Sequence, residues 1–243
     1  MGSVCDYAGY DYKTKFWDEV DRRYENLCEH RTIARLLKKY GVHDAEIMDL
    51  GCGFGRLFDA YGPFGKKFIL LDYAENMLTQ AKERLGERSE ITFIQGDARD
   101  VPLPDASVDT IISIRTLHHL PDYPRFIAEL HRLLRSGGIV IFEIPNFRHW
   151  INIGRFLMGK QKNPFAKRVT PVGSFSNFHP QLIYDAVKAQ GFITLEKVNT
   201  SFFRSGFLKN KVNPETLTQW DMALQGILSW TDLTPSIYLV CKK

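Results

Sequence analysis

The chain has 243 residues, of which 44% are hydrophobic and 25% are charged, and its formal net charge is +4 at pH 7. This hydrophobic fraction is ordinary for a folded protein and excludes a disordered chain. No apolar run reaches the roughly 18 residues that a membrane-spanning helix needs, and the start lacks the pattern of a secretory leader. The cysteines form no C-x-x-C pair, so we expect no disulfide framework, no metal site and a cytoplasmic location. They are Cys5, Cys28, Cys52 and Cys241.

The positive charge is concentrated in one part of the chain. Residues 144–213 contain eleven lysines and arginines against two acidic residues, so this segment carries +9 and the remainder carries −5. Aromatic side chains alternate with the basic ones. Four interpretations stay open: a lid over an anionic or hydrophobic small molecule, peripheral contact with an anionic membrane surface, contact with nucleic acid, and a solvated insertion. Nucleic acid is unlikely, because the segment has no recurrent basic motif.

The first predicted element is a helix over residues 16–40, although a polar patch at residues 29–32 leaves open whether it is divided. Short apolar runs then predict strands at residues 46–50, 67–72, 91–95, 108–114 and 139–144. The intervening helices include one that ends at Gly86 and one over residues 123–134 that stops at Gly137 and Gly138. Buried strands separated by helices are typical of a parallel sheet covered on both faces.

Beyond Pro145 the regular alternation of strand and helix ends. The sequence predicts a helix near residues 148–159, a loop-like stretch up to residue 178, a helix from Pro180 to Gly191 and a strand over residues 192–198. A further helix begins at Asn213, and the last strand covers residues 236–241. We expect the two final strands to pair antiparallel at the edge of the sheet. The predicted fold class is α/β, with a doubly wound sheet.

A glycine-rich loop follows the first strand, in the segment Asp49-Leu-Gly51-Cys-Gly53-Phe-Gly55. Glycine lets the backbone turn sharply and lets a ligand approach without meeting a Cβ atom. The third glycine comes one position too early for the dinucleotide fingerprint, which disfavours a nicotinamide enzyme. A tight turn that binds nothing is the alternative interpretation.

Carboxylates follow the next two strands. Asp72 ends the second strand, where an acid can accept both hydroxyls of a ribose, and Asp97 ends the third, where an acid can accept from an adenine amine. Met77, just after Asp72, can pack against a base. Because ligands of open α/β sheets bind at the carboxyl ends of the strands, these groups together predict a nucleoside site.

Residues 46–145 resemble the core of the class I S-adenosylmethionine-dependent methyltransferases of the small-molecule type, which share a D-x-G-x-G-x-G motif. The resemblance is carried, in order, by residues 46–55, 71–78, 95–109, 117–120 and 134–138. It implies a seven-stranded Rossmann-like sheet whose last strand is antiparallel, S-adenosylmethionine as cofactor and S-adenosylhomocysteine as product. The positions that it assigns to the cofactor are Asp49, Gly51, Cys52, Gly53, Gly55, Asp72, Tyr73, Met77, Gly96, Asp97, Ala98, Ile114 and Arg115. Many members of the family have a small or neutral residue at the position of Arg115, whose role therefore stays open.

Methyl transfer from a sulfonium needs the reacting atoms in line, and it needs a base only if the acceptor must lose a proton. His118 and His119 follow the fourth strand and are the candidate bases, with His119 favoured; packing is the alternative role for both. Aromatic residues near the start can close over the cofactor or pack against the first helix. They are Tyr7, Tyr10, Tyr12, Phe16 and Trp17.

We therefore predict a single domain over residues 1–243. Its parts are a helical cap (1–44), a cofactor-binding core (45–145), a lid insertion (146–178) and the rest of the sheet (179–243). The predicted activity is methyl transfer to a small hydrophobic or anionic metabolite. The alternatives are an S-adenosylmethionine-dependent enzyme that acts on tRNA or transfers another group, and a non-catalytic binding module. The oligomeric state stays open.

Overall fold

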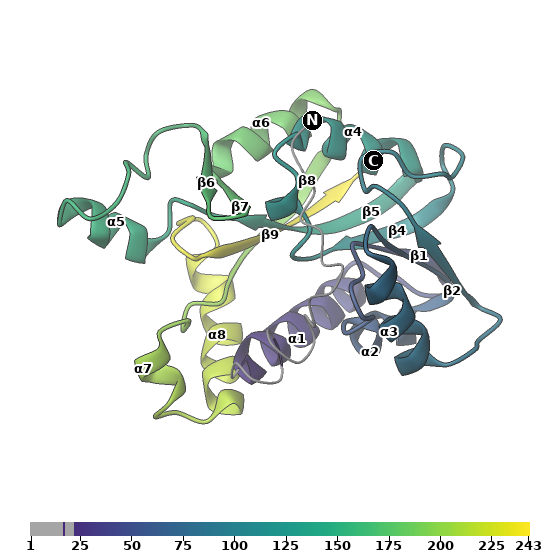
Figure 1. Ribbon diagram of the computed structural model, residues 1–243, viewed down its shortest axis with the longest axis horizontal. Coiled ribbons are helices and arrows are strands. Elements are labelled where there is room, and N and C mark those ends of the chain that lie inside the picture. Colours follow the sequence, from purple (N-terminus) through teal and green to yellow (C-terminus); the bar gives the residue numbers. More distant parts are fainter. Residues whose placement is uncertain (1–16, 18–21) are drawn as a thin grey trace.

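The computed structural model describes Trp17 and residues 22–243, and it contains one seven-stranded sheet (Figure 1). The strands lie in the order β3 (Ile91–Gln95), β2 (Gly65–Asp72), β1 (Ala45–Leu50), β4 (Val108–Ser113), β5 (Leu134–Pro145), β9 (Ser236–Lys242) and β8 (Ile193–Thr200). The pairs from β3 to β5 are parallel, whereas β9 runs antiparallel to both β5 and β8. The predicted α/β sheet with an antiparallel last strand is confirmed.

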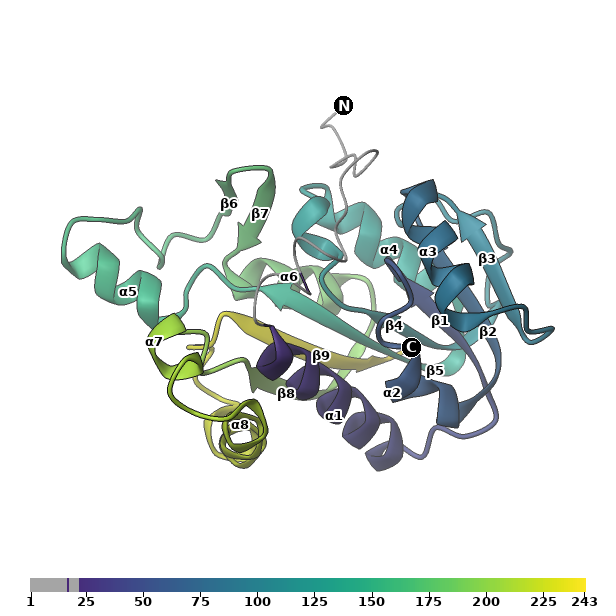
Figure 2. The same ribbon diagram turned by 60° about the horizontal axis from the view of Figure 1, so that its bottom comes forward.

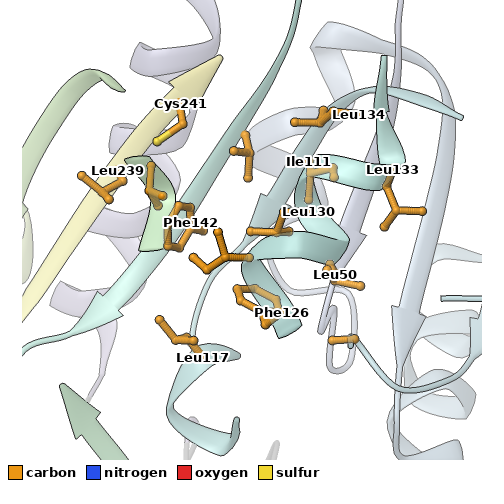
Figure 3. Packing of buried hydrophobic residues seen from close by; sticks show 14 of the residues in the cluster. Leu50, Ile111, Leu117, Phe126, Leu130, Leu133, Leu134, Phe142, Leu239 and Cys241 are labelled. Atoms are coloured by element: carbon orange, nitrogen blue, oxygen red, sulfur yellow. The ribbon is translucent and has the colours of Figure 1, made fainter. Parts of the chain in front are cut away.

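Helices cover both faces of this sheet. In Figure 1, α4 (Tyr123–Leu133) and α6 (Pro180–Ala189) lie above it, while α1 (Arg23–Lys39), α2 (Phe58–Tyr61) and α3 (Glu75–Leu85) lie below. Side chains of alternate strand residues lie on opposite faces of the sheet, since Met48 and Leu50 belong to one buried cluster and Ile47 belongs to the other. Each fully buried aliphatic or aromatic side chain stabilises the fold by about 1.5–3 kcal/mol. Figure 3 shows the cluster that α4 forms with the sheet, including Phe126, Leu130, Leu133, Ile111 and Phe142.

The first helix is continuous from Arg23 to Lys39, so the polar patch does not divide it. Two polar side chains of that patch are buried against tertiary partners. Thr32 accepts a hydrogen bond from Gln225 of α8 (Pro214–Leu228) at 2.9 Å, and Glu29 pairs with arginines described below. The part of the predicted helix before residue 22, apart from Trp17, lies outside the described residues.

The end of α4 differs from the prediction. The helix ends at Leu133 and β5 begins at once, so Gly137 and Gly138 lie inside a strand and do not stop a helix. Gly137 has φ +80°, and a Cβ on Gly138 would lie 2.8 Å from the carbonyl oxygen of Asp109. The pairing of β4 with β5 shifts register here, which identifies the glycines as part of a β-bulge.

The segment after β5 contains α5 (Trp150–Leu157), as predicted, but its second part is not a loop. Strands β6 (Val169–Val172) and β7 (Phe175–Phe178) pair antiparallel around a two-residue connection whose Gly173 has φ +61°. In Figures 1 and 2, α5 lies away from the sheet. A short helix that the sequence did not predict, α7 (Gly206–Lys209), follows β8. Among the described residues, no helix is both long and apolar enough to cross a membrane.

Candidate functional site

The carboxyl ends of β1, β2, β3 and β4 open into one cavity of about 910 Å³, its mouth included. Parallel pairing places these four strand ends at one edge of the sheet, so residues far apart in the chain, such as Gly51 and His119, meet there. Among the residues that the sequence singled out, the cavity is lined by Gly51, Cys52, Gly53, Asp72, Tyr73, Met77, Gly96, Asp97, Ala98, Ile114, Arg115, His119 and Trp17.

The glycine loop is held close to its neighbours. The amides of Gly51 and Cys52 both donate to the carbonyl of Leu71, at 2.8 and 2.9 Å. Gly51 has φ +85°, and a Cβ there would lie 2.2 Å from Oγ1 of Thr116, so only glycine fits. Gly53 has φ +54° and nothing within 4 Å of a Cβ position, so this part of the loop faces open space.

Asp72 joins the loop to the end of β2. One carboxylate oxygen accepts from the amide of Gly53 at 2.8 Å, and the other accepts from the amide of Ala74 at 3.0 Å. Burial raises the pKa of this carboxyl above its usual range, and these amides oppose the shift. Since a carboxylate has about four acceptor positions, Asp72 can still accept from two hydroxyls.

Asp97 is engaged by its neighbour Arg99. The guanidinium donates from Nε and Nη2 to both carboxylate oxygens, over 2.6–3.2 Å, and the Arg99 amide donates at 2.8 Å. The Arg99 hydrogen bonds lower the pKa of Asp97, so the group is ionised at neutral pH. Sequence reasoning did not identify this partner, which restricts how a ligand can use Asp97.

A buried charge cluster forms another wall of the cavity. Glu29 of α1 is 1% exposed and accepts from Arg56 at 2.5 Å and from Nε of Arg115 at 2.8 Å. Nη2 of Arg115 forms an ion pair with the same carboxylate at 2.6 Å. Burial alone would raise the pKa of Glu29, but the two guanidinium groups outweigh it and lower the pKa to about 2. Both guanidinium groups also face the ring of Trp17, at 3.9 Å for Arg56 and 5.1 Å for Arg115. The cluster holds two positive charges and one negative charge.

The two candidate bases differ in position. His119 lines the cavity, whereas His118 lies behind it, with the two ring centres 4.0 Å apart. The ring of Phe175 from β7 meets both histidines edge-on at 5.0 and 5.2 Å. Burial lowers the pKa of His119 to about 4, so its imidazole is neutral at pH 7. Burial, followed by the charges of His119, Arg115 and Arg204, lowers the pKa of His118 well below its usual range.

Asp49 and Gly55 do not line the cavity. Asp49 is 1% exposed beneath the loop, accepts from the hydroxyl of Tyr61 at 2.9 Å, and has its pKa raised to about 7 by burial. A Cβ on Gly55 would lie 3.1 Å from Leu85 and 3.5 Å from Ala81, so this glycine lets the loop pack against α3. The predicted aromatic residues Tyr7, Tyr10, Tyr12 and Phe16 lie outside the described residues.

Sequence reasoning missed Glu29 and Thr116 and gave no role to Arg56. Thr116 donates to the carbonyl of Leu50 at 3.0 Å and fills the space beside Gly51. Glu29 carried one usable signal, a charged residue on an otherwise apolar helix face, but its partners lie 27 and 86 residues away in the chain.

The sheet order, the glycine loop and the acids at successive strand ends define the Rossmann-like methyltransferase fold. The solved structure of an S-adenosylmethionine-dependent methyltransferase from Mesorhizobium loti shares this fold, with a TM-score of 0.58 at 19% identity over 86% of this chain and 96% of that one. At this identity the similarity concerns the fold alone.

Residues 48–142 match the family described as "Methyltransferase domain". Two curated relatives are malonyl-[acyl-carrier protein] O-methyltransferase from Serratia marcescens, 36% identical over 44% of this chain and 42% of that protein, and demethylmenaquinone methyltransferase from Staphylococcus aureus, 33% identical over 52% and 57%. The chain therefore spans about half the length of the curated relatives that it matches. Within residues 48–142 the chain is therefore similar to the class I S-adenosylmethionine-dependent methyltransferases.

Proposed function

We propose that this protein is an enzyme that transfers the methyl group of S-adenosylmethionine to a small hydrophobic or anionic metabolite and releases S-adenosylhomocysteine. The observation that carries this proposal is the single cavity lined by residues from four strand ends. The names of the two relatives support methyl transfer, and they differ in the acceptor, so they do not define it here.

The residues present fit the cofactor. Gly53 leaves open space where a Cβ would project, Asp72 keeps acceptor positions for the ribose hydroxyls, and Met77 and Ala98 offer apolar contact to the adenine. Arg56 and Arg115 leave one positive charge uncompensated after Glu29, which suits the carboxylate of the methionyl end. Asp49 and Gly55 act one layer further out, by supporting the loop.

When bound, the cofactor supplies an activated methyl group, and the protein has to orient the acceptor and exclude water. His119 lines the cavity as a neutral imidazole, so it can accept a hydrogen bond or a proton from an acceptor hydroxyl. Its low pKa makes it a weak base. We therefore assign His119 the orienting role, with proton removal reserved for acidic acceptors, and His118 supports its ring from behind.

Transfer of a different group, in which an additional carboxylate on the cofactor would be bound by Arg115, is a weaker candidate. Nε of Arg115 already donates to Glu29 at 2.8 Å, and Nη2 forms an ion pair with the same carboxylate at 2.6 Å. An extra carboxylate would have to displace a buried and fully ionised Glu29. A non-catalytic module and an enzyme acting on tRNA remain alternatives that an activity assay distinguishes.

Isothermal titration with S-adenosylmethionine and with S-adenosylhomocysteine tests the cofactor assignment. Both should bind, and Asp72→Ala should abolish the binding. Asp59→Ala is the matched control, because Asp59 is an exposed carboxylate that pairs with Arg84 outside the cavity. Absence of binding to the unmodified protein, or equal binding by Asp72→Ala, would overturn the proposal. Native mass spectrometry of freshly purified protein then searches for a retained acceptor, and release of S-adenosylhomocysteine measures turnover.

We also propose that the segment over residues 146–178 is a lid and that it rests on anionic membrane surfaces. Leu157 and Met158 at the end of α5 are 78% and 62% exposed. Among the described residues, Arg155, Lys160 and Lys162 beside them have no ion-pair partner. Apolar side chains flanked by basic ones favour an anionic lipid surface. The cytoplasmic location stays a prediction.

Co-sedimentation with vesicles tests the membrane contact. Vesicles that contain phosphatidylglycerol should retain the protein, pure phosphatidylcholine should not, and Leu157→Ser with Met158→Ser should release it. Ile193→Ser is the control, because Ile193 is an exposed apolar residue (61%) on β8, outside residues 146–178. The proposed contact is contradicted if both kinds of vesicle retain the protein equally. It is also contradicted if the Leu157/Met158 variant and the Ile193 variant are retained equally.

A further inference from the structure

Arg204, in the loop between β8 and α7, has buried hydrogen-bond donors that the described residues leave without acceptors. Its side chain is 25% exposed, but both Nε and Nη2 are buried and neither makes a hydrogen bond. Nε and Nη2 form one edge of the guanidinium plane. This edge presents two parallel N–H groups, which is the geometry that binds a carboxylate through both oxygens.

The nearest carboxylate does not satisfy this edge. Glu143 of β5 lies 3.9 Å from Nη2 of Arg204, which is too long for a hydrogen bond. Its two oxygens have other donors, since Oε1 accepts from the hydroxyl of Ser236 and Oε2 accepts from the amide of Arg115 at 2.8 Å. Burial of guanidinium donors without acceptors is unfavourable, so the arrangement calls for a further anionic group.

The backbone around Arg204 is held in place from the protein interior. The amide of Phe202 donates to Asp221 at 2.8 Å, and the amide of Phe203 donates to the hydroxyl of Tyr24 at 3.1 Å. Tyr24 in turn donates to Asp221 at 2.5 Å. The loop is thus fixed to α1 and α8, and the Arg204 side chain extends from a rigid base, as a preorganised binding residue requires.

Arg204 is also close to the candidate acceptor side of the cofactor cavity. Its positive charge acts on His118, whose ring lies 4.0 Å from that of His119 in the cavity wall. The same charge acts on His149, which precedes α5 and has a buried Nδ1 without a hydrogen-bond partner among the described residues. The geometry agrees, since Glu143, 3.9 Å from Nη2 of Arg204, accepts from the amide of Arg115 in the cavity wall at 2.8 Å.

An anion at Arg204 is favoured by unsatisfied donors and not by an excess of charge. The excess positive charge of Arg56 and Arg115 over Glu29 is the one assigned above to the methionyl carboxylate, whereas Arg204 lies near one buried carboxylate of its own, Glu143. Burial lowers the pKa of both His118 and His149, so the two imidazoles are neutral and can donate or accept hydrogen bonds without adding charge. The two buried N–H groups of Arg204 are therefore the feature that a carboxylate would satisfy.

We propose that Arg204 is the specificity-determining residue of the acceptor site and binds a carboxylate of the methyl acceptor through its Nε and Nη2 atoms. This inference rests on the proposed methyl transfer and narrows the hydrophobic or anionic metabolite to a carboxylic acid. The apolar ring of Phe175 beside His118 and His119 provides the surface for the acid's hydrophobic part.

Matched acids and amides test the proposal on the full chain. Benzoate and hexanoate, each compared with its primary amide, are titrated up to their solubility limits while NMR follows the imidazole signals of His118 and His149, with and without S-adenosylhomocysteine. The acids should shift these signals and the amides should not. Arg204→Gln should weaken the response about tenfold to hundredfold, as expected for lost charge-assisted hydrogen bonds, and Arg204→Lys should weaken it less.

Two further variants separate Arg204 from its surroundings. Arg168→Gln removes the same charge from an exposed position in the basic segment and should leave the response to acids unchanged. Arg204→Met removes both buried donors and should abolish the response to acids.

The proposal is overturned if acids and amides act alike or not at all, if Arg168→Gln weakens the response as much as Arg204→Gln, or if Arg204→Met keeps the response to acids. Failure of S-adenosylhomocysteine to bind would contradict the proposed function instead, while the comparison of acid and amide still decides the role of Arg204.

Discussion

Gly51→Ala tests whether the glycine loop is shaped by contact within the protein. The new Cβ would lie 2.2 Å from Oγ1, 2.7 Å from Cγ2 and 2.9 Å from Cβ of Thr116, all on one short side chain. Thr116 cannot move away freely, because its hydroxyl donates to the carbonyl of Leu50 at 3.0 Å. Either the loop shifts or the bond between Thr116 and Leu50 breaks.

The expected loss of stability has three parts. Alanine in the left-handed region, at φ +85°, costs about 1–2 kcal/mol. The overpacked contact adds about 1–3 kcal/mol, and the broken hydrogen bond about 1 kcal/mol. Gly51→Ala should therefore lower the free energy of unfolding by about 3–6 kcal/mol. At this chain length each kcal/mol lowers the melting temperature by about 2 °C, so the shift is about 6–12 °C.

Two other glycines separate the contributions. Gly86, at φ +70° and ψ 178° in the cap of α3, has nothing within 4 Å of a Cβ position, so Gly86→Ala isolates a backbone cost of about 1–3 kcal/mol. Gly53, at φ +54°, is equally open but lines the cavity. Gly53→Ala should lose no more stability than Gly86→Ala, yet it should weaken binding of S-adenosylhomocysteine.

Urea unfolding and isothermal titration measure these effects. If Gly51→Ala and Gly86→Ala lose the same stability, the contact with Thr116 does not constrain the loop and the reasoning is refuted. If Gly53→Ala binds the nucleoside as tightly as the unmodified protein, the loop does not approach the ligand at that residue.

Three further predictions concern the buried charges and histidines. Glu29→Gln should destabilise the protein by about 3–5 kcal/mol in urea unfolding, because it leaves Arg56 and Arg115 buried without a carboxylate. The control Asp59→Asn breaks an exposed ion pair and should destabilise by less than about 1 kcal/mol. The pKa of His119 is about 4 in the folded protein against about 6.5 unfolded, so its contribution to stability is complete above pH 6.5 and is lost as the pH falls towards 4. Titration of His119 should therefore lower the free energy of unfolding by about 2 kcal/mol between pH 7 and pH 5. His119→Asn should reduce this dependence of stability on pH. Phe175→Ala should let water reach the imidazole and raise the pKa of His119 above 4 in an NMR titration; an unchanged pKa would mean that Phe175 does not bury it.

The sequence predicted the parts of the fold that follow from local patterns. Apolar strands separated by helices indicate a parallel sheet, and parallel pairing brings the residues after each strand to one edge. For this reason Gly51, Asp72, Asp97 and Arg115 were predicted together and line one cavity. Asp49 and Gly55 belong to the same motif but do not line the cavity, because Asp49 lies beneath the loop with Tyr61 and Gly55 packs against α3.

Features decided by distant contacts were not predictable from the sequence. A glycine after a helix can cap it or form a bulge, and only the pairing of β5 with β4 shows that Gly137 and Gly138 form a bulge. The hairpin of β6 and β7 was mistaken for a loop because of Pro171, yet a two-stranded sheet tolerates proline at an edge. Gly173-Ser174, the two-residue connection between β6 and β7, was the signal that could have identified the hairpin.

Residue 115 combines two constraints that a single sequence position does not reveal. Its φ of +60° is unfavourable for an arginine, and a hydrogen bond from its amide to the buried carboxylate of Glu143, at 2.8 Å, offsets that cost. Its side chain is held separately by Glu29. The backbone position is thus set by Glu143 and the charge in the cavity wall by Glu29, so the two carboxylates act independently. Arg204 lies beside the same carboxylate, but its Nη2 is 3.9 Å from Glu143 and too far for a hydrogen bond. The strained backbone at the cofactor cavity and the unsatisfied arginine therefore share one buried neighbour, Glu143.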